Sequence, residues 1–274
     1  MIPVDNSSNF GHYEPNVIIK TIILITRNIG RNWFSKRMIF FLRKIVILVS
    51  DDCIDTVLFN AKLRLYTKGN VSEKRALFSP QIFEKEERDF ISSKCNDHSI
   101  FIDIGSNIGL YSFSVGSVYK TFKNTKIYSI EPHPFLFQRL KYNASLNMDI
   151  PIYPREIALM DKSGKFKLDT PNENLGQGKI SHSGQHEVIA KSLIDFVNDE
   201  SIESIAAIKI DVEGNEENII IPFLDIAEKK LLPLIIILEK NDDSWKTDLL
   251  KKLKYKGYIV KKKTRMNYIL ELRV

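Results

Sequence analysis

The feature that most constrains the fold is an apolar run followed by a glycine-rich turn at residues 100–109. Residues 100–104 read Ile-Phe-Ile-Asp-Ile, which is typical of a strand buried on both faces of a parallel sheet. Asp103 interrupts this run, and a buried carboxylate must meet hydrogen-bond donors. Gly105 and Gly109 then allow a sharp turn and the close approach of a ligand. Because a helix pattern follows, the segment predicts a nucleotide-type cradle.

A second carboxylate supports this prediction. The glycine spacing is D-x-G-x-N-x-G rather than the dinucleotide fingerprint G-x-G-x-x-G, so the glycines alone are weak evidence. Residues 126–130 predict the next strand, which ends at Glu131, 26 residues after Gly105. A ribose-binding carboxylate is expected roughly 20 residues after the turn. We therefore expect Glu131 to bind ribose hydroxyls; a solvated strand-end charge, and a turn cap for Asp103, are the alternative interpretations.

Three motifs, in this order, resemble the FkbM-type S-adenosylmethionine-dependent methyltransferases. They are Asp103-Ile-Gly-Ser-Asn-Ile-Gly109, Ser129-Ile-Glu131-Pro132 and Ile208-Lys-Ile-Asp211-Val-Glu213-Gly214. Residues 78–87 are similar to the lead-in segment of that family, and the resemblance covers residues 55–240. It implies a methyltransferase whose cofactor is S-adenosyl-L-methionine.

The resemblance also implies which residues bind this cofactor. They are Asp103, Gly105, Ser106, Asn107, Gly109, Glu131, Pro132, Ala158 and Asp211. Ala158 is expected at the exit of a third strand, beside the adenine. His133, which stands between two prolines, is either a further cofactor contact or a structural histidine.

The order of predicted elements gives the fold class. Further strands are predicted at 152–158, 205–210, 234–239, 257–260 and 267–272, with helices between them. This order predicts a Rossmann-like, seven-stranded, mostly parallel methyltransferase sheet with helices on both faces, plus an N-terminal helical and β-hairpin extension. We expect the extension to occupy residues 1–92 and the methyltransferase domain residues 93–274.

The extension differs in composition from the rest of the chain. Residues 1–15 predict a loose arm, and residues 16–50 combine apolar runs with seven basic residues and no Asp or Glu. These runs are shorter than the roughly 18 residues that a bilayer span needs. We expect helices packed on the domain, with a basic amphipathic surface on a membrane or polyanion as the alternative. Residues 55–78 predict short strands that include a hairpin, and residues 84–95 predict a helix.

Charge and cysteine content bound the partners. The net charge is +6, and eight basic residues lie within Lys251–Arg265, which suit a solvated surface or an anionic partner. No RNA-binding motif accompanies them, so we do not expect nucleic acid to bind. Cys53 and Cys95 are too few for a disulfide framework and suit a reducing compartment. We expect a cytoplasmic protein, with peripheral membrane association through its basic segments as a further possibility; the sequence carries no marker of oligomeric state.

A polar stretch at residues 170–187 predicts a long loop, which is either an acceptor-binding loop or a solvated surface loop. Its candidate contacts are Asn174, Gln177, His182 and His186. Gly184 between the two histidines breaks the helix that a metal site of this spacing would need.

The chemistry is expected at the strand that ends in Asp211 and Glu213. We expect an O-methyltransferase acting on a hydroxyl of a sugar, glycan, glycolipid or other small metabolite, in which one of these carboxylates orients or deprotonates the hydroxyl and Glu239 assists. We expect no resident metal; a divalent ion held by these acids, or acids that only cap helices, are the rival interpretations. An RNA methyltransferase and a catalytically inactive nucleotide-binding or interaction protein are the alternative functions.

Overall fold

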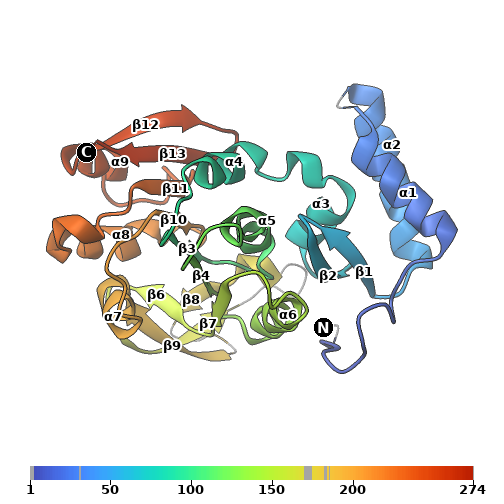
Figure 1. The fold of residues 1–274 in the computed structure, drawn as a ribbon, viewed down its shortest axis with the longest axis horizontal. Helices are drawn as coiled ribbons and strands as arrows, with labels where there is room; N and C mark the ends of the chain where they lie inside the picture. The colour runs from blue at the N-terminus through green and yellow to red at the C-terminus, as the bar shows by residue number, and fades with distance from the viewer. Residues whose placement is uncertain (1–2, 31, 170–174, 182–183, 185, 274) are drawn as a thin grey trace.

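The computed structural model describes residues 3–30, 32–169, 175–181, 184 and 186–273. Within them the helices are α1 (Val17–Asn28), α2 (Trp33–Val49), α3 (Val71–Phe78), α4 (Lys85–Ser93), α5 (Leu110–Tyr119), α6 (Pro134–Ser145), α7 (Leu193–Asp199), α8 (Glu216–Ile226) and α9 (Leu249–Tyr255). The strands are β1 (Cys53–Leu58), β2 (Ala61–Tyr66), β3 (Ile100–Ile104), β4 (Lys126–Ile130), β5 (Ile152–Arg155), β6 (Ala158–Met160), β7 (Gly164–Asp169), β8 (Lys179–Ser181), β9 (His186–Ser192), β10 (Ala207–Ile210), β11 (Ile235–Glu239), β12 (Tyr258–Lys263) and β13 (Asn267–Leu272). Figure 1 shows their arrangement.

The described residues form a central sheet of seven strands in the order β12-β13-β11-β10-β3-β4-β5. The five strands from β11 to β5 are parallel, whereas β13 is antiparallel to both of its neighbours. This confirms the predicted Rossmann-like, mostly parallel sheet. Asp103 of β3 lies in register with Lys209 of β10 on one side and with Ser129 of β4 on the other. Because parallel strands end at the same edge, the acids that follow these strands gather there.

Helices cover both faces of the sheet. Successive side chains of β3 therefore pack alternately into the apolar core on one face and the apolar core on the other. Phe101 packs with Ile91 of α4 and Val115 of α5 on one face. Ile102 packs on the other face in a core that includes Phe196 of α7 and further side chains of α8 and α9. Burial of both faces accounts for the nearly continuous apolar sequence of the strand.

The third strand is shorter than the sequence predicts. β5 pairs with β4 only as far as Ile130 and Arg155, where β4 ends, so no further pairing holds the chain in this sheet. Ala158 instead begins β6, which pairs with β9 in a separate sheet of order β6-β9-β7-β8. The prediction that one strand extends from residue 152 to Ala158 is therefore wrong, although Ala158 still faces the site described below.

Two other local predictions are corrected. α3 replaces the short strands predicted at the end of residues 55–78, because the side chain of Asn70 accepts a hydrogen bond from the Ser72 amide at 2.9 Å and caps the helix. The predicted long loop is partly sheet, since β8 and β9 both pair with β7. The predicted β1–β2 hairpin is confirmed, with a turn at Phe59 and Asn60, which both have positive φ.

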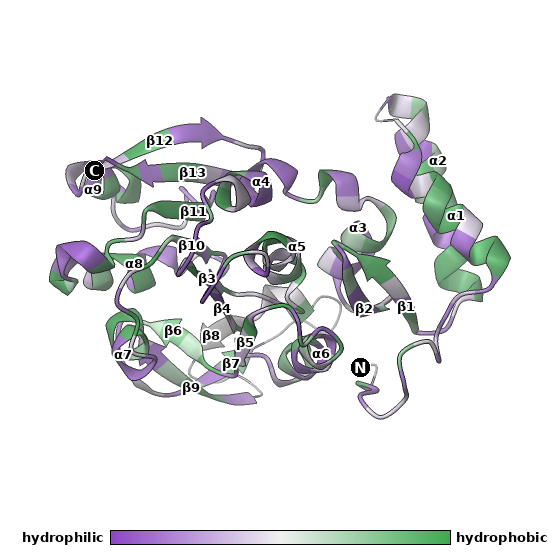
Figure 2. Ribbon diagram, viewed as in Figure 1, coloured by the Kyte–Doolittle hydropathy of each residue, from purple (hydrophilic) through white to green (hydrophobic). Residues whose placement is uncertain are grey.

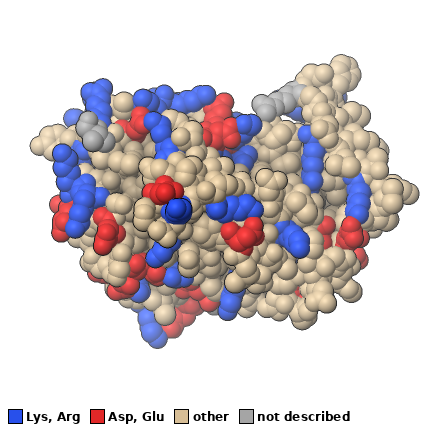
Figure 3. Space-filling view, viewed as in Figure 1, with Lys and Arg blue, Asp and Glu red and all other residues tan. Residues whose placement is uncertain are grey.

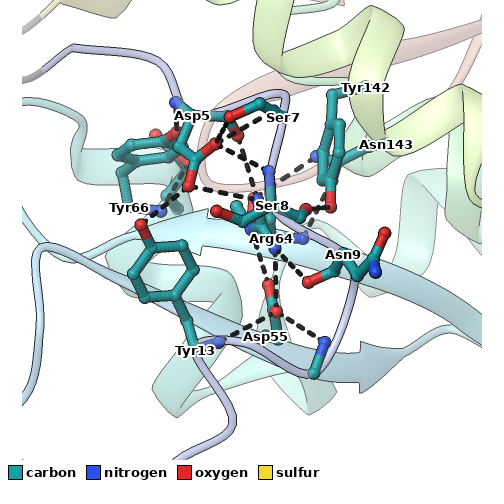
Figure 4. A network of polar contacts seen from close by, with 12 residues as sticks. Asp5, Ser7, Ser8, Asn9, Tyr13, Asp55, Arg64, Tyr66, Tyr142 and Asn143 are labelled. Atoms are coloured by element: carbon teal, nitrogen blue, oxygen red, sulfur yellow. Dashed lines mark hydrogen bonds and ion pairs between the residues drawn. The ribbon is translucent and has the colours of Figure 1, made fainter.

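The N-terminal arm is held against the β1–β2 hairpin (Figure 4), so the prediction of a loose arm is wrong for its described part. The guanidinium of Arg64 is buried and forms two hydrogen bonds to the Asp55 carboxylate, at 2.8 and 3.0 Å. It also donates to the backbone carbonyls of Asp5 and Asn9 at 3.0 and 2.9 Å. Asp55 in turn accepts the Gly11 amide at 2.8 Å. One buried ion pair thus fixes the path of the arm.

The helices predicted within residues 16–50 are confirmed as α1 and α2, but the two helices pack unequally. α1 buries Ile19 and Ile23 in a core shared with α3 and the hairpin, and Arg27 donates to the Leu77 carbonyl at 2.9 Å. α2 buries only Ser35 and Val46. Figure 2 shows apolar residues over much of both helices, interleaved with hydrophilic ones. No helix in the described part of the chain is long and apolar enough to cross a membrane.

Replacement of Arg64 by alanine is expected to lower the free energy of unfolding by about 3–5 kcal/mol, because it leaves the buried Asp55 carboxylate without its cation. Urea denaturation followed by circular dichroism measures this change. Lys68→Ala is the matched control: it removes an exposed ion pair with Asp52 and should cost less than about 1 kcal/mol. Equal losses in the two variants would contradict the assigned role of the buried pair.

Candidate active site

A cavity of about 310 Å³ lies at the carboxyl ends of β3, β4, β10 and β11. The predicted site residues that line it are Asp103, Gly105, Ser106, Asn107, Glu131, Pro132, Ala158, Asp211 and Glu213, and His133 and Glu239 line it as well. Gly109 does not line the cavity; it lies in the turn between β3 and α5, directly before the helix. The structure therefore gathers residues from four strand ends and from the second sheet around one cavity.

In the turn after β3, neighbouring atoms pack closely against the backbone of two glycines. Gly105 has a φ of +74°, and a Cβ atom on it would lie 1.9 Å from the Asp211 carbonyl oxygen, so no other residue fits. Gly109 has a φ of +84°, and its Cβ would lie 2.6 Å from a Leu140 methyl group. Asn107 is also left-handed, and its side-chain oxygen accepts a hydrogen bond from Asn70 at 2.6 Å. The cap of α3 thereby ties the N-terminal extension to the turn.

Glu131 is nearly fully buried at the end of β4 and braces this turn. One carboxylate oxygen accepts the Asn107 amide at 2.8 Å, and the other accepts the His133 amide at 2.9 Å. Burial raises the pKa of Glu131 to about 7. Each oxygen has one further lone-pair direction, so the carboxylate has capacity for two more donors from the cavity.

Asp103 is fully buried and acts on α5 rather than on the glycine turn. Its Oδ2 accepts the Ser112 hydroxyl at 2.6 Å, and Ser112 accepts the Ser129 hydroxyl at 2.7 Å. Burial raises the pKa of Asp103 although Lys209 lies nearby. The alternative interpretation of Asp103 as a cap on the turn is therefore wrong, because its hydrogen bond joins β3 to the helix.

The ion pair between Lys209 and Asp211 dominates the electrostatics of the cavity. The Lys209 ammonium is buried, lies 2.7 Å from the Asp211 carboxylate, and sits 5.2 Å from the centre of the Tyr111 ring. Burial by itself raises the pKa of Asp211, but attraction to Lys209 outweighs it and holds the pKa below its ordinary value. Burial, followed by the negative charge of Asp211, raises the pKa of Glu239 to about 8. The pKa values of these two neighbouring carboxyl groups are therefore shifted in opposite directions.

Sequence reasoning missed several residues of this cavity. Lys209 and Glu84 carry charge, Tyr111 and Asn267 carry polar groups, and Arg75 lies at its exposed side. Burial raises the pKa of Glu84, and Asn267 donates to Glu84 at 3.3 Å. Of these residues, only Lys209 could have been found from the sequence, because a lysine inside an otherwise apolar strand needs a carboxylate partner.

The residues that the sequence suggested as acceptor contacts could be located only in part. The ring of His186 lies beside that of His133, tilted by 54°, with 5.3 Å between the ring centres. Asn174 and His182 lie outside the described residues, and so does the side chain of Gln177. Among the described residues, no group of three or more His, Cys, Asp or Glu side chains is arranged to hold a metal ion.

Comparison with protein families shows the family of this chain. The family model described as "Methyltransferase FkbM domain" matches residues 103–260, which is more than half of the chain. The chain belongs to the FkbM methyltransferase family. Its cofactor is S-adenosyl-L-methionine. A comparison with curated proteins gave no significant match.

Solved structures of methyltransferases are similar to this FkbM chain. Methyltransferase FkbM from Methylobacillus flagellatus KT is 16% identical, with 74% of this chain and 54% of that chain covered and a TM-score of 0.45. The METTL16 MTase domain is 13% identical, with coverages of 96% and 91% and a TM-score of 0.47. M. jannaschii TYW2 in complex with AdoMet is 10% identical, with coverages of 81% and 84% and a TM-score of 0.39. The chain thus spans about half the length of the FkbM structure that it matches.

The cavity fits the cofactor of the family. Four buried polar atoms of its lining residues have no hydrogen-bond partner within the described structure: Asp103 Oδ1, Ser106 Oγ, Tyr111 Oη and His133 Nε2. Apolar side chains of β6, Leu159 and Met160, offer a wall for a flat base beside Ala158. Glu131 offers acceptor capacity for a ribose diol. Acceptors, donors and an apolar wall are the groups that an adenosyl ligand requires.

Replacement of Glu131 by alanine is expected to weaken the binding of S-adenosylmethionine by about one to two decades, because a charged acceptor of two hydroxyl hydrogen bonds is lost. Isothermal titration calorimetry measures the affinity. Glu156→Ala, at an exposed carboxylate that does not line the cavity, is the control. Equal affinities for the Glu131 variant and the unaltered chain would place the ribose elsewhere.

The affinity should also depend on pH through Glu131. Ribose hydroxyls donate hydrogen bonds, so they favour the ionised carboxylate. Since burial raises the pKa of Glu131 to about 7, affinity should rise between pH of about 6 and about 8 and then level off. The Glu131→Gln variant has no carboxylate to titrate and should bind with a flatter pH profile. A profile identical in the two proteins would assign the dependence to another group.

Proposed function

We propose that the chain is an O-methyltransferase that methylates a hydroxyl of a sugar, glycan, glycolipid or other small metabolite. One observation carries this proposal: the carboxyl groups of Asp211 and Glu239 line the same cavity, beside the buried Lys209 ammonium, and their pKa values are shifted in opposite directions. A hydroxyl loses its proton as it gains a methyl group, so its methylation benefits from a proton acceptor whose pKa lies near neutrality. Glu239, with a pKa of about 8, meets this requirement.

S-adenosylmethionine supplies the methyl group and keeps the electron pair of the broken carbon–sulfur bond. The residues of the chain provide position and proton transfer. Glu131 and the turn from Gly105 to Asn107 would hold the adenosyl part, which leaves the end of the cavity at β10 and β11 for the acceptor. There the acceptor oxygen forms its new bond to carbon, and its proton passes to the carboxyl pair.

Lys209 has a positioning role in this scheme. Its ammonium fixes the Asp211 carboxylate at 2.7 Å and keeps Asp211 ionised. The resulting negative charge is one of the two main causes that raise the pKa of Glu239, after burial. One buried cation thus lowers the pKa of one carboxyl group, and the charge of that group helps to raise the pKa of the other.

Glu213 remains a second candidate for contact with the acceptor. It lines the cavity and has a φ of +55°, a left-handed backbone conformation that is uncommon outside glycine. The following Gly214 has a φ of +100°, so two successive residues of this turn have left-handed backbone. Strained backbone of this kind is concentrated at functional sites.

The first experiment identifies the acceptor. Hydroxylated glycans and glycolipids are offered with methyl-labelled S-adenosylmethionine, and a bulk RNA preparation is offered in parallel. We expect label on a glycan or glycolipid, in an ether bond that is stable to mild base. Label on RNA alone would replace the proposal by an RNA methyltransferase, and inhibition by a chelator would shift the deprotonation to a bound divalent ion.

With an acceptor in hand, Glu239→Gln is expected to lower kcat by about 100-fold or more, within the usual contribution of general base catalysis, while cofactor affinity is kept. In the unaltered enzyme kcat/KM should rise with pH up to a plateau above about 8, because Glu239 must lose its proton. In the Glu239→Gln variant, kcat/KM should no longer rise with pH over this range. Asp211→Asn should reduce turnover as well, since it removes the anion that raises the pKa of Glu239.

Glu203→Gln, at an exposed acid that does not line the cavity, is the control for both variants. Full activity of Glu239→Gln and Asp211→Asn together with unchanged pH profiles would remove the carboxyl pair from the mechanism. The same measurement on Glu213→Gln decides whether that residue contributes.

A further inference from the structure

α2 carries large apolar side chains that nothing in the described structure covers. Trp33 is 59% exposed, Phe34 76%, Phe41 62% and Leu48 83%. On α1, Ile18 is exposed as well. Single exposed apolar residues are normal on a protein surface, but several large ones on one helix indicate an interaction site.

These side chains alternate with cations along one face of α2. Trp33, Arg37, Phe41, Lys44 and Leu48 follow one another at spacings of four, four, three and four residues, which places them on one helical stripe. All five are exposed. We call these five residues the α2 stripe. Its alternation of apolar and basic groups is unsuited to a protein core, in which the cations would need buried partners.

The charge around the α2 stripe has a single sign. Between Glu14 and Asp51 the chain has seven basic residues and no acidic one. In the part of the chain that the structure describes, none of the four cations of α2 pairs with a carboxylate. Figure 3 shows Lys and Arg atoms set among uncharged surface on the side of the molecule where α1 and α2 lie. A partner for this face must therefore be anionic.

A small basic pocket on the flank of α2 repeats this preference. It has a volume of about 100 Å³, and its lining combines three basic residues, Arg43 of α2 and Lys74 and Arg75 of α3, with Ser79 and four apolar residues, Ile39, Phe78, Ile82 and Phe83; no acidic residue lines it. The Nε atom of Arg43 is buried and has no hydrogen-bond partner in the described structure. Three cations around one hollow, with a donor left over, suit the phosphate of a headgroup.

A second copy of the chain fits this face poorly. Pairing of two α2 stripes would bring Arg37 and Lys44 against the same cations of the partner, at a cost that rises as water is excluded. A bilayer surface satisfies both kinds of side chain: aromatic rings insert at the headgroup level, and Lys and Arg extend to the phosphates. α2 has 17 residues, and about 1.5 Å per residue gives it a length suited to lying in the interface.

We propose that the chain docks peripherally on an anionic phospholipid bilayer through the α2 stripe, with a headgroup phosphate in the Arg43–Lys74–Arg75 pocket. Arg75 and Phe83 line both this pocket and the large cavity, so the docked surface adjoins one wall of the candidate active site. Docking there brings a membrane-borne hydroxyl within reach of the cavity. The docking itself is independent of the proposed methyl transfer, and its tests use no acceptor.

The first test is co-sedimentation of the full chain with vesicles of phosphatidylcholine alone and with vesicles that also contain phosphatidylserine. We expect binding only to the anionic vesicles and release at high salt. The double variant Arg37→Gln/Lys44→Gln should lower the partition coefficient roughly thirtyfold. The matched control Lys251→Gln/Lys252→Gln removes two cations from α9 and should leave binding unchanged. Equal losses in both double variants would show that vesicle binding depends only on the net charge of the protein, and would overturn the proposal.

The second test uses the fluorescence of Trp33. Its emission should shift to the blue on addition of anionic vesicles, because the indole moves from water into the interface. The Trp33→Tyr variant retains Trp245, the second tryptophan of the chain, and should show no shift. Vesicle-bound protein with unchanged Trp33 emission would contradict insertion of the α2 stripe.

The third test addresses the pocket and the rival occupant. Arg43→Gln/Lys74→Gln should weaken binding to anionic vesicles while thermal unfolding stays that of the unaltered chain. Sedimentation velocity without lipid should show that the α2 stripe is not a dimer contact. A stable dimer that Phe41→Gln converts to monomer, without vesicle binding by either protein, would assign the face to a second copy.

Discussion

The ion pair between Lys209 and Asp211 is the interaction on which the candidate site depends, because the cavity concentrates acids. Carboxyl groups of Asp103, Asp211 and Glu239 approach it from three adjacent strands, and Lys209 is the buried cation among them. Desolvation alone would protonate all three. The ammonium keeps Asp211 ionised, and the acid beside it then titrates near neutrality. A site that accepts a proton needs neighbouring acids whose pKa values differ.

The same region links the central sheet to α3 and the β1–β2 hairpin, which precede it in the chain. Asn70 caps α3 and hydrogen-bonds to Asn107 in the cofactor turn, while the buried Glu73 carboxylate pairs with Arg139 of α6 at 2.7 Å. Arg64 then ties the hairpin to the arm. Through these contacts α3, which borders both the large cavity and the small basic pocket, takes a fixed position. The extension therefore forms one wall of the site, next to α2.

The parts of the site that could be predicted lie at strand ends. Asp103 and Glu131 stand where an apolar run meets a turn, and parallel pairing brings such ends to one edge whatever else the chain does. Ala158 reaches the cavity by another route than predicted, since β5 stops where β4 stops and the chain continues into a second sheet. No local pattern reveals which sheet a short strand joins. The alternating order of predicted strands and helices indicated the methyltransferase sheet, whereas only the family resemblance indicated the cofactor.

The burial of charged groups escaped prediction for a physical reason. Arg64 and Asp55 are ordinary charged residues on opposite strands of a hairpin, and they are buried by distant parts of the chain, the N-terminal arm and Tyr142 of α6. Glu84 is far from Lys209 in sequence, yet both line the cavity. The exposure of α2 could not be predicted either, because an apolar helix is usually core. Its alternating cations were the only indication that the surface stays open.

The most direct measurement is a crystal structure of the chain with S-adenosylhomocysteine. The ribose hydroxyls should lie within hydrogen-bond distance of the Glu131 carboxylate, and the sulfur atom should point to the end of the cavity that Asp211 and Glu239 line. A nucleoside bound away from Glu131, or a sulfur atom directed away from that carboxyl pair, would contradict both the placement of the cofactor and the proposed proton transfer.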